Sequence, residues 1–243
     1  MALGSLSVLL AAFVKGSIGF GFPTLGTPLL SLLTGVHAAV VLLFLPNIAM
    51  DALQLARLGG PGVVARRFAT LLAAGAVGTL LGTGLLVWLS PHTATLVLGA
   101  VVLLYVAASL VGVAPRVAPR WERAVSPVVG FVAGVIGGVT NVPGTPLVMY
   151  FNALGLAKQE FVAAVAFTFI VYKVVQLGVV LCFGLLSWPL VGWSVALTVV
   201  GLGGFWLGLR VQDRLDPRSF NRAVLGFLAV LGVWLTIRSL RAG

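Results

Sequence analysis

The stretch FVKGSIG at residues 13–19 returns as FVAGVIG at residues 131–137, and this match decides how the chain is built. At the same offset, GTPL at residues 26–29 falls on GTPL at residues 144–147. Nine of the 17 aligned positions are identical, more than two unrelated apolar segments usually share. We therefore interpret the chain as a duplication, with a first repeat at 1–113, a linker at 114–123 and a second repeat at 124–243.

The composition around these motifs places the chain in a lipid bilayer. Of the 243 residues, 60% are hydrophobic and only 8% are charged, about a third of the charged fraction of a soluble domain. The net charge of +10 raises the question of a nucleic-acid partner, but no basic patch is interleaved with exposed aromatic residues, so none is expected. The single cysteine, Cys182, excludes a disulfide framework or a cysteine-rich metal site.

Apolar segments of about 20 residues, the length that crosses the hydrocarbon layer, divide the chain. Full spans are expected at 38–57, 67–89, 93–113, 160–183, 190–209 and 220–237. Two further apolar regions, 2–37 and 124–157, are interrupted by Gly, Pro, Thr and Asn, and each is expected to form two shorter helices joined near the membrane centre. The predicted fold class is an all-α polytopic membrane protein whose repeats each carry three full spans and one broken pair.

Basic residues gather in alternate connections between these spans. Lys and Arg occur near residues 57–67, 116–123, 158 and 210–222, whereas the turns at 35–37, 90–92 and 184–189 hold none. Because cytoplasmic loops collect Lys and Arg, the basic connections are predicted to face the cytoplasm and both termini to lie outside. Three full spans then separate the two FV-G motifs, so the repeats have inverted topology, an arrangement that recurs in secondary transporters.

The Gly-Thr-Pro motifs carry the chemistry of a helix that starts inside the membrane. Thr is a favoured N-cap, and Pro suits the first helical position. Free N–H groups and the positive dipole end at such a start bind anions, whereas the alternative is that these residues serve only packing or kinking. The substrate-binding residues predicted on this basis are Gly26, Thr27, Pro28, Gly144, Thr145 and Pro146.

Three charged residues fall within the apolar segments: Lys15, Asp51 and Lys173. Ionisable groups at this depth are costly and usually face a bundle interior or a watery cavity, so each is a functional candidate. Asp51 and Lys173 are expected to approach each other, or to serve separately as proton carrier and anion counter-charge. The alternative for Asp51 and Lys173 is a structural ion pair between the halves, and for Lys15 snorkelling toward the cytoplasmic interface is favoured.

Amide side chains lie near Asp51 and Lys173 in the sequence. Asn47, Asp51 and Gln54 follow i, i+4, i+7 spacing and share one helix face. In the second repeat, Gln176 is the counterpart of Gln54. We expect Asn47, Gln54 and Gln176 to contact a substrate.

Polar residues also lie in the two breaks. Thr140 and Asn141 occupy the second break, and Asn141 is predicted to bind substrate; the alternative is that such residues only satisfy freed backbone groups. His37 and His92 fall in predicted outer turns without Cys, Asp or Glu nearby, so neither a metal nor another cofactor is expected.

The glycine-rich break followed by proline, at 16–28 and again at 130–146, resembles the sulfite exporter TauE/SafE family over nearly the whole chain. The resemblance implies a permease of the bacterial inner membrane for sulfite, sulfonates or related small anions, driven by the proton gradient. The chain departs from the pattern at residues 19–22, where many members run several glycines together, and at Thr140 and Asn141 in the comparable second stretch.

These observations predict a secondary transporter for a small oxyanion, with Lys173 supplying positive charge and Asp51 carrying the proton. The alternative on the same scaffold is a passive anion channel. An intramembrane enzyme is not expected, because the sequence offers neither a Ser/His/Asp set nor His/Glu ligand spacing. A purely structural or assembly role is a further alternative, and the sequence is compatible with a homo-oligomer.

Overall fold

The computed structural model describes residues 2–58, 62–111, 116–212 and 217–242, with the backbone alone at 63, 119, 217–221 and 241–242. Part of the expected linker, residues 114 and 115, and part of the last basic connection, Asp213, Arg214 and Asp216, lie outside this range. The described residues form helices and short connections, without a strand. The helices are α1 (Ala2–Ile18), α2 (Phe22–Thr34), α3 (Val36–Leu42), α4 (Phe44–Arg57), α5 (Gly62–Arg67), α6 (Ala69–Trp88), α7 (Pro91–Val111), α8 (Pro119–Thr140), α9 (Gly144–Ala153), α10 (Lys158–Cys182), α11 (Trp188–Val211) and α12 (Pro217–Ala242).

In the described part of the chain, seven helices are long and apolar enough to cross a membrane. All six expected full spans are among them, which confirms the polytopic all-α class. The seventh is α8, expected to be one of two shorter helices. It is longer because it begins at Pro119, inside the expected linker, where the extended Ala118 and the preset φ of proline start a helix early.

The span Val36–Arg57 is divided at Leu43 into α3 and α4. Pro46 has no N–H, so the carbonyl of Leu42 lacks its usual helical partner. The hydroxyl of Ser194 in α11 donates a hydrogen bond of 2.9 Å to that carbonyl. A neighbouring helix thus satisfies the backbone group that the proline frees.

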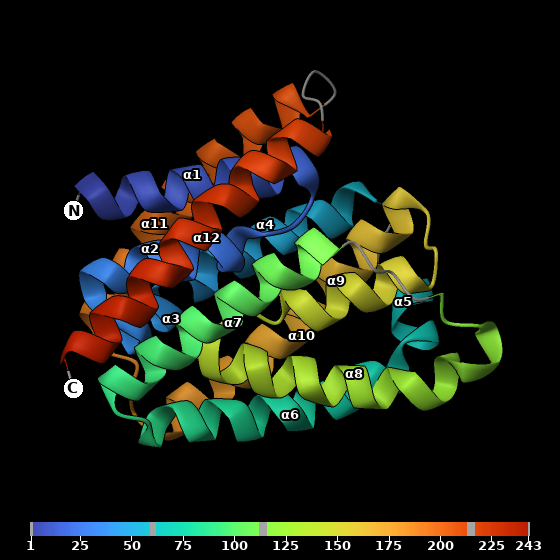
Figure 1. Cartoon of the computed structure of the whole chain (residues 1–243), viewed down its shortest axis with the longest axis horizontal. Coiled ribbons are helices and arrows are strands. Elements are labelled where there is room, and N and C mark those ends of the chain that lie inside the picture. The colour runs from blue at the N-terminus through green and yellow to red at the C-terminus, as the bar shows by residue number, and fades with distance from the viewer. Residues whose placement is uncertain (1, 59–61, 112–115, 213–216, 243) are drawn as a thin grey trace.

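Each broken region folds back on itself as a helical hairpin. The start of α1 lies beside the end of α2, because Gly4 packs against Leu30 and Leu33. In the second hairpin the start of α8 lies beside the end of α9, since the hydroxyl of Tyr150 donates to the carbonyl of Glu122 at 3.2 Å. Each broken pair therefore returns to the side from which it entered (Figure 1).

The helix starts within these hairpins differ from those expected at the Gly-Thr-Pro motifs. The first break comes earlier, at Gly19 and Gly21, whose φ angles of 90° and 96° suit glycine. Helix α2 begins directly after it at Phe22, so Thr27 is not an N-cap and Pro28 lies inside the helix. The second break has Asn141 at φ 65°, and α9 begins at Gly144 with Pro143 as its N-cap.

The second motif does begin a helix, but Thr145 lies in the first turn of α9, with no side-chain cap in the structure. The prediction of Thr27 as an N-cap is wrong because the chain breaks at the left-handed Gly19 and Gly21, and α2 has already begun at Phe22. The first break also lies toward one end of the molecule, where Gly19 lines a cavity together with Arg57.

Two close helix seams hold the bundle together. Helix α8 packs along α6, and α1 packs along α11 (Figure 1). Glycines permit both approaches: a Cβ at Gly134 would overlap the carbonyl oxygen of Gly75, and one at Gly208 would overlap that of Phe13. Helix α7 pairs with α12. Helices α4 and α10 contact each other, and they also contact α11 and α6, respectively.

Figure 1 places both chain ends at one end of the bundle and α5 with the start of α8 at the other. The turn between α6 and α7 lies at the same end as the termini. The basic residues of α5 and of the start of α8 thus lie at the opposite end of the bundle from the α6–α7 turn, which holds no Lys or Arg.

Candidate functional site

An ion pair lies buried where α1 meets α4. The ammonium of Lys15 donates a hydrogen bond of 2.5 Å to Oδ1 of Asp51, and both side chains are 0% exposed. The expectation that Lys15 reaches out to the interface is therefore wrong. Its position in the last turn of α1, next to α4, gives the ammonium a carboxylate partner inside the bundle, which compensates the cost of burying it.

A second buried cation, Lys173 on α10, is held by neutral groups. Its ammonium donates hydrogen bonds to Oδ1 of Asn141 and to Oε1 of Gln176. The amide of Asn141 in turn donates to the hydroxyl of Thr27 at 2.8 Å. The break between α8 and α9 is thereby joined to α2 and to α10 through side chains.

Both lysines interact with Asp51. Lys173 and Asp51 interact electrostatically, although the ion pair of Asp51 is with Lys15. Each ammonium also lies over an aromatic ring, Lys15 at 5.9 Å from the Phe169 centroid and Lys173 at 5.1 Å from that of Phe44. The sequence-based expectation that Asp51 and Lys173 lie near each other agrees with this arrangement, but it overlooked the role of Lys15.

Two glutamines satisfy the backbone at the breaks. The amide of Gln54 donates to the carbonyl of Gly19 at 2.8 Å, and that of Gln176 to the carbonyl of Gly138 at 3.0 Å. The hydroxyl of Thr140 donates to Ile136 and accepts from the N–H of Val142. Thr140 thus satisfies freed backbone groups, the alternative weighed above for the residues of the breaks. The two glutamines, which were expected to contact a substrate, also bond backbone carbonyls.

Several buried polar atoms in the same region have no hydrogen-bond partner. They are Nδ2 and Oδ1 of Asn47, Oδ2 of Asp51, Oε1 of Gln54 and Oγ1 of Thr145. Their residues are at most 7% exposed. Buried polar groups are normally paired, so unpaired ones in one region indicate a place for a ligand or water. We call Lys15, Thr27, Asn47, Asp51, Gln54, Asn141, Thr145, Lys173 and Gln176 the central cluster.

The glycines and prolines of the predicted site shape the backbone around this cluster. Gly26 is packed against Ala11 and Leu43, and Gly144 lies against the hydroxyl of Thr24. Pro28 lies inside α2 and Pro146 in the first turn of α9. Gly26 and Gly144 thus leave space for neighbouring side chains, and Pro146 leaves the start of α9 with one N–H fewer.

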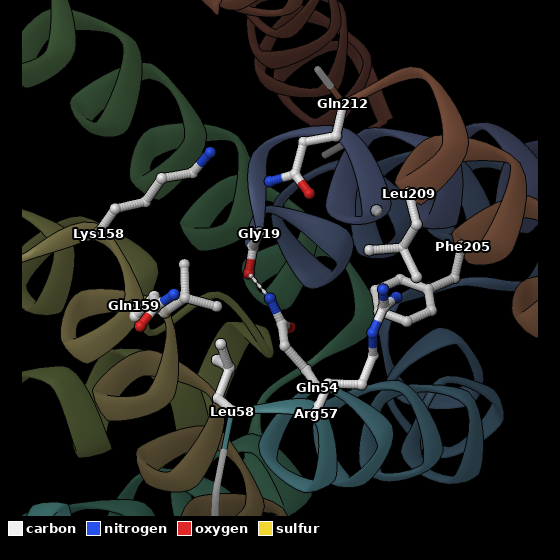
Figure 2. Close-up of a pocket in the computed structure, with 11 residues that line it drawn as sticks. Gly19, Gln54, Arg57, Leu58, Lys158, Gln159, Phe205, Leu209 and Gln212 are labelled. Carbon is white, nitrogen blue, oxygen red and sulfur yellow. Dashed lines mark hydrogen bonds between the residues drawn. The ribbon is translucent and has the colours of Figure 1, made fainter.

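A cavity of about 290 Å³ reaches the cluster from one end of the bundle (Figure 2). It is lined by Gly19 and Gln54 on the inner side and by the charged side chains of Arg57 and Lys158. In the sequence, Arg57 and Lys158 indicate only the orientation of the spans. Nothing in their spacing indicated that the ends of α4 and α10 would bring them to one cavity, which we call the vestibule.

Other titratable residues lie away from the cluster. The ring of His37 bonds the carbonyl of Leu86 at 2.9 Å, and Ser239 donates to the carbonyl of His92 at 2.9 Å. No group of three metal-ligating side chains occurs among the described residues. Arg67 bonds Glu122 at 2.8 Å and Glu160 at 2.6 Å, and its pKa is raised chiefly by the hydrogen bond to Glu122.

Seven apolar helices around a buried polar cluster define a polytopic membrane protein with an interior suited to a small polar ligand. The sequence model of the sulfite exporter TauE/SafE family matches residues 5–235, and the chain belongs to this family of membrane permeases. No curated protein and no solved structure matches the chain.

Proposed function

We propose that the protein is a secondary transporter that moves a small oxyanion, such as sulfite or an organosulfonate, across the bacterial inner membrane by alternating access coupled to protons. The main support for this function is the central cluster, which combines the buried cation Lys173 with polar atoms that have no hydrogen-bond partner. The family match supports the substrate class.

The packing of the helices supports inverted repeats. Under the offset of the sequence match, α1 corresponds to α8, and the seam of α1 on α11 corresponds to that of α8 on α6. Gly75, Gly78 and Gly82 in α6 have the same spacing as Gly201, Gly204 and Gly208 in α11. Each seam therefore joins helices from different halves, as expected of two entwined copies that rock about a central site.

The anion is proposed to bind between Lys173 and the start of α9. The first turn of α9 offers free N–H groups, the positive end of the helix dipole and the unpartnered hydroxyl of Thr145. We do not retain the expectation that both Gly-Thr-Pro motifs bind the anion at a helix start, because α2 starts at Phe22 and Thr27 bonds Asn141. Arg57 and Lys158 in the vestibule would attract the anion to its entry.

A carrier is favoured over a passive channel by the burial of the cluster. Lys15 and Asp51 are 0% exposed and Lys173 is 2% exposed. A pore that was open in this conformation would instead expose the side chains that line it. The vestibule therefore ends at the cluster, as expected of a state that is open to one side only. By the charge rule, that side is the cytoplasm.

Asp51 is proposed as the proton-binding group, because its Oδ2 has no partner and it lies next to both lysines. Asp51→Asn should abolish the acceleration of anion flux by a pH gradient in proteoliposomes and leave anion exchange without a gradient in place. The matched control is Glu160→Gln, at the exposed Arg67 pair, which should keep the response to pH.

Flux is measured with radiolabelled sulfite or methanesulfonate. An unchanged response to the gradient in Asp51→Asn would remove the proposed role of Asp51. Unitary currents in planar bilayers would favour the channel instead, and absence of flux for any small oxyanion would overturn transport.

A further inference from the structure

The central cluster holds an odd number of charges, and this bears on which anions it accepts. Its ionisable members are Lys15, Asp51 and Lys173, all at most 2% exposed. Lys15 and Asp51 form an ion pair and cancel each other. Lys173 is bonded to the neutral amides of Asn141 and Gln176. With both lysines protonated and Asp51 ionised, the cluster therefore carries one positive charge in excess.

We propose that this single excess charge makes the protein, in the state in which Asp51 is ionised, selective for monoanions, such as an alkanesulfonate or hydrogen sulfite, over dianions of the same shape such as sulfate. The proposal rests on the proposed function, because it assumes that the anion binds in the central cluster. Lys15 and Asp51 are then specificity-determining residues: together they set the charge that the anion must balance.

The physical reason is the cost of unbalanced charge at this depth. A charge in a region of low dielectric must be compensated nearby or it is strongly disfavoured. A monoanion beside Lys173 brings the net charge of the cluster to zero. A dianion leaves one negative charge uncompensated, and the carboxylate of Asp51, whose Oδ2 has no partner, repels it further.

Positive groups in the vestibule do not provide the missing compensation. Arg57 and Lys158 are exposed at the cavity, where water screens their charges. They attract monoanions and dianions alike to the entry. Discrimination between the two valences therefore belongs to the buried groups.

Methanesulfonate and sulfate provide a matched pair of probes, because both are tetrahedral and differ by one oxygen in place of a methyl group and by one charge. Binding is measured by titration calorimetry on the full chain in nanodiscs at neutral pH and constant ionic strength, for the wild-type protein, Asp51→Asn and Lys15→Met/Asp51→Asn. These proteins carry cluster charges of one, two and one, respectively, from the residues present.

The wild-type protein should bind methanesulfonate more tightly than sulfate. Asp51→Asn should shift the ratio of the two affinities toward sulfate by about tenfold or more. The added positive charge attracts a dianion twice as strongly as it attracts a monoanion at the same distance. The double variant should return the ratio toward that of the wild type, because its excess charge is again one. That return separates net charge from loss of the Asp51 side chain.

Four results would contradict the proposal. Sulfate binding as tight as that of methanesulfonate in the wild-type protein would overturn the charge rule while leaving transport intact. An unchanged affinity ratio in Asp51→Asn, or a double variant that matches Asp51→Asn, would do the same. Failure of the wild-type protein to bind either anion would overturn the proposed site and the proposed function together.

Discussion

At the residue scale, substitution of the two members of the buried ion pair, Lys15 and Asp51, should lower stability by different amounts. Lys15→Met leaves the carboxylate of Asp51 without its bonded partner, which costs about 3–5 kcal/mol in buried pairs. Asp51→Asn is milder, because the amide oxygen still accepts from the ammonium. The variant Lys15→Met should therefore lower the thermal unfolding temperature in detergent sharply, and Lys15→Met/Asp51→Asn should recover much of the loss.

A double-mutant cycle separates this interaction from the packing of the Lys15 stem. Equal unfolding temperatures for Lys15→Met and the double variant would show that the charge of Asp51 is not what destabilises the single variant.

Individual site residues could be predicted where charge alone marked them. Asp51 and Lys173 stand out because ionisable groups are rare within apolar spans, and the structure buries both. The burial of Lys15 was missed because its position near a helix end allows either snorkelling or pairing, and only the fold shows that α4 lies beside it. Likewise, the bond of Thr27 to Asn141 joins residues far apart in the sequence and has no local signal.

At the scale of the element, the glycine seam between α6 and α8 is a close approach of two backbones. A Cβ at Gly134 would overlap the carbonyl oxygen of Gly75, whereas one at Gly84, also in α6, meets nothing within 4 Å. Gly134→Ala should destabilise the protein by about 1–3 kcal/mol through overpacking. Gly84→Ala should instead be neutral or stabilising by up to about 1 kcal/mol, from helix propensity.

Both variants are compared by thermal unfolding in the same detergent. Equal unfolding temperatures for Gly134→Ala and Gly84→Ala would show that α6 and α8 can move apart enough for a methyl group without loss of stability.

The helices themselves follow from the sequence better than their ends do. Apolar length located six of the seven spans among the described residues, because crossing a bilayer demands about 20 apolar residues. The starts of α2 and α8 were misplaced for different reasons. The left-handed Gly19 and Gly21 end α1 before the Thr27 motif, and the Pro119 turn extends α8 into a polar stretch that hydropathy assigns to a linker.

At the scale of the whole molecule, the distribution of basic residues predicts which end of the bundle faces the cytoplasm. Helix α10 separates Gln159, in the vestibule, from Ser187, which is exposed beyond its far end. With the exposed native cysteine removed by Cys182→Ser, Gln159→Cys and Ser187→Cys report the two ends by reaction with a membrane-impermeant, charged thiol reagent.

In intact spheroplasts, Ser187→Cys should react and Gln159→Cys should stay protected until the membrane is permeabilised, because the distribution of basic residues predicts that the vestibule, lined by Arg57 and Lys158, faces the cytoplasm. Cys182→Ser alone is the background control. Labelling of Gln159→Cys from outside would reverse the orientation and place the termini in the cytoplasm. Labelling of both positions from one side would contradict the crossing of α10, and with it the separation of the two ends on which alternating access depends.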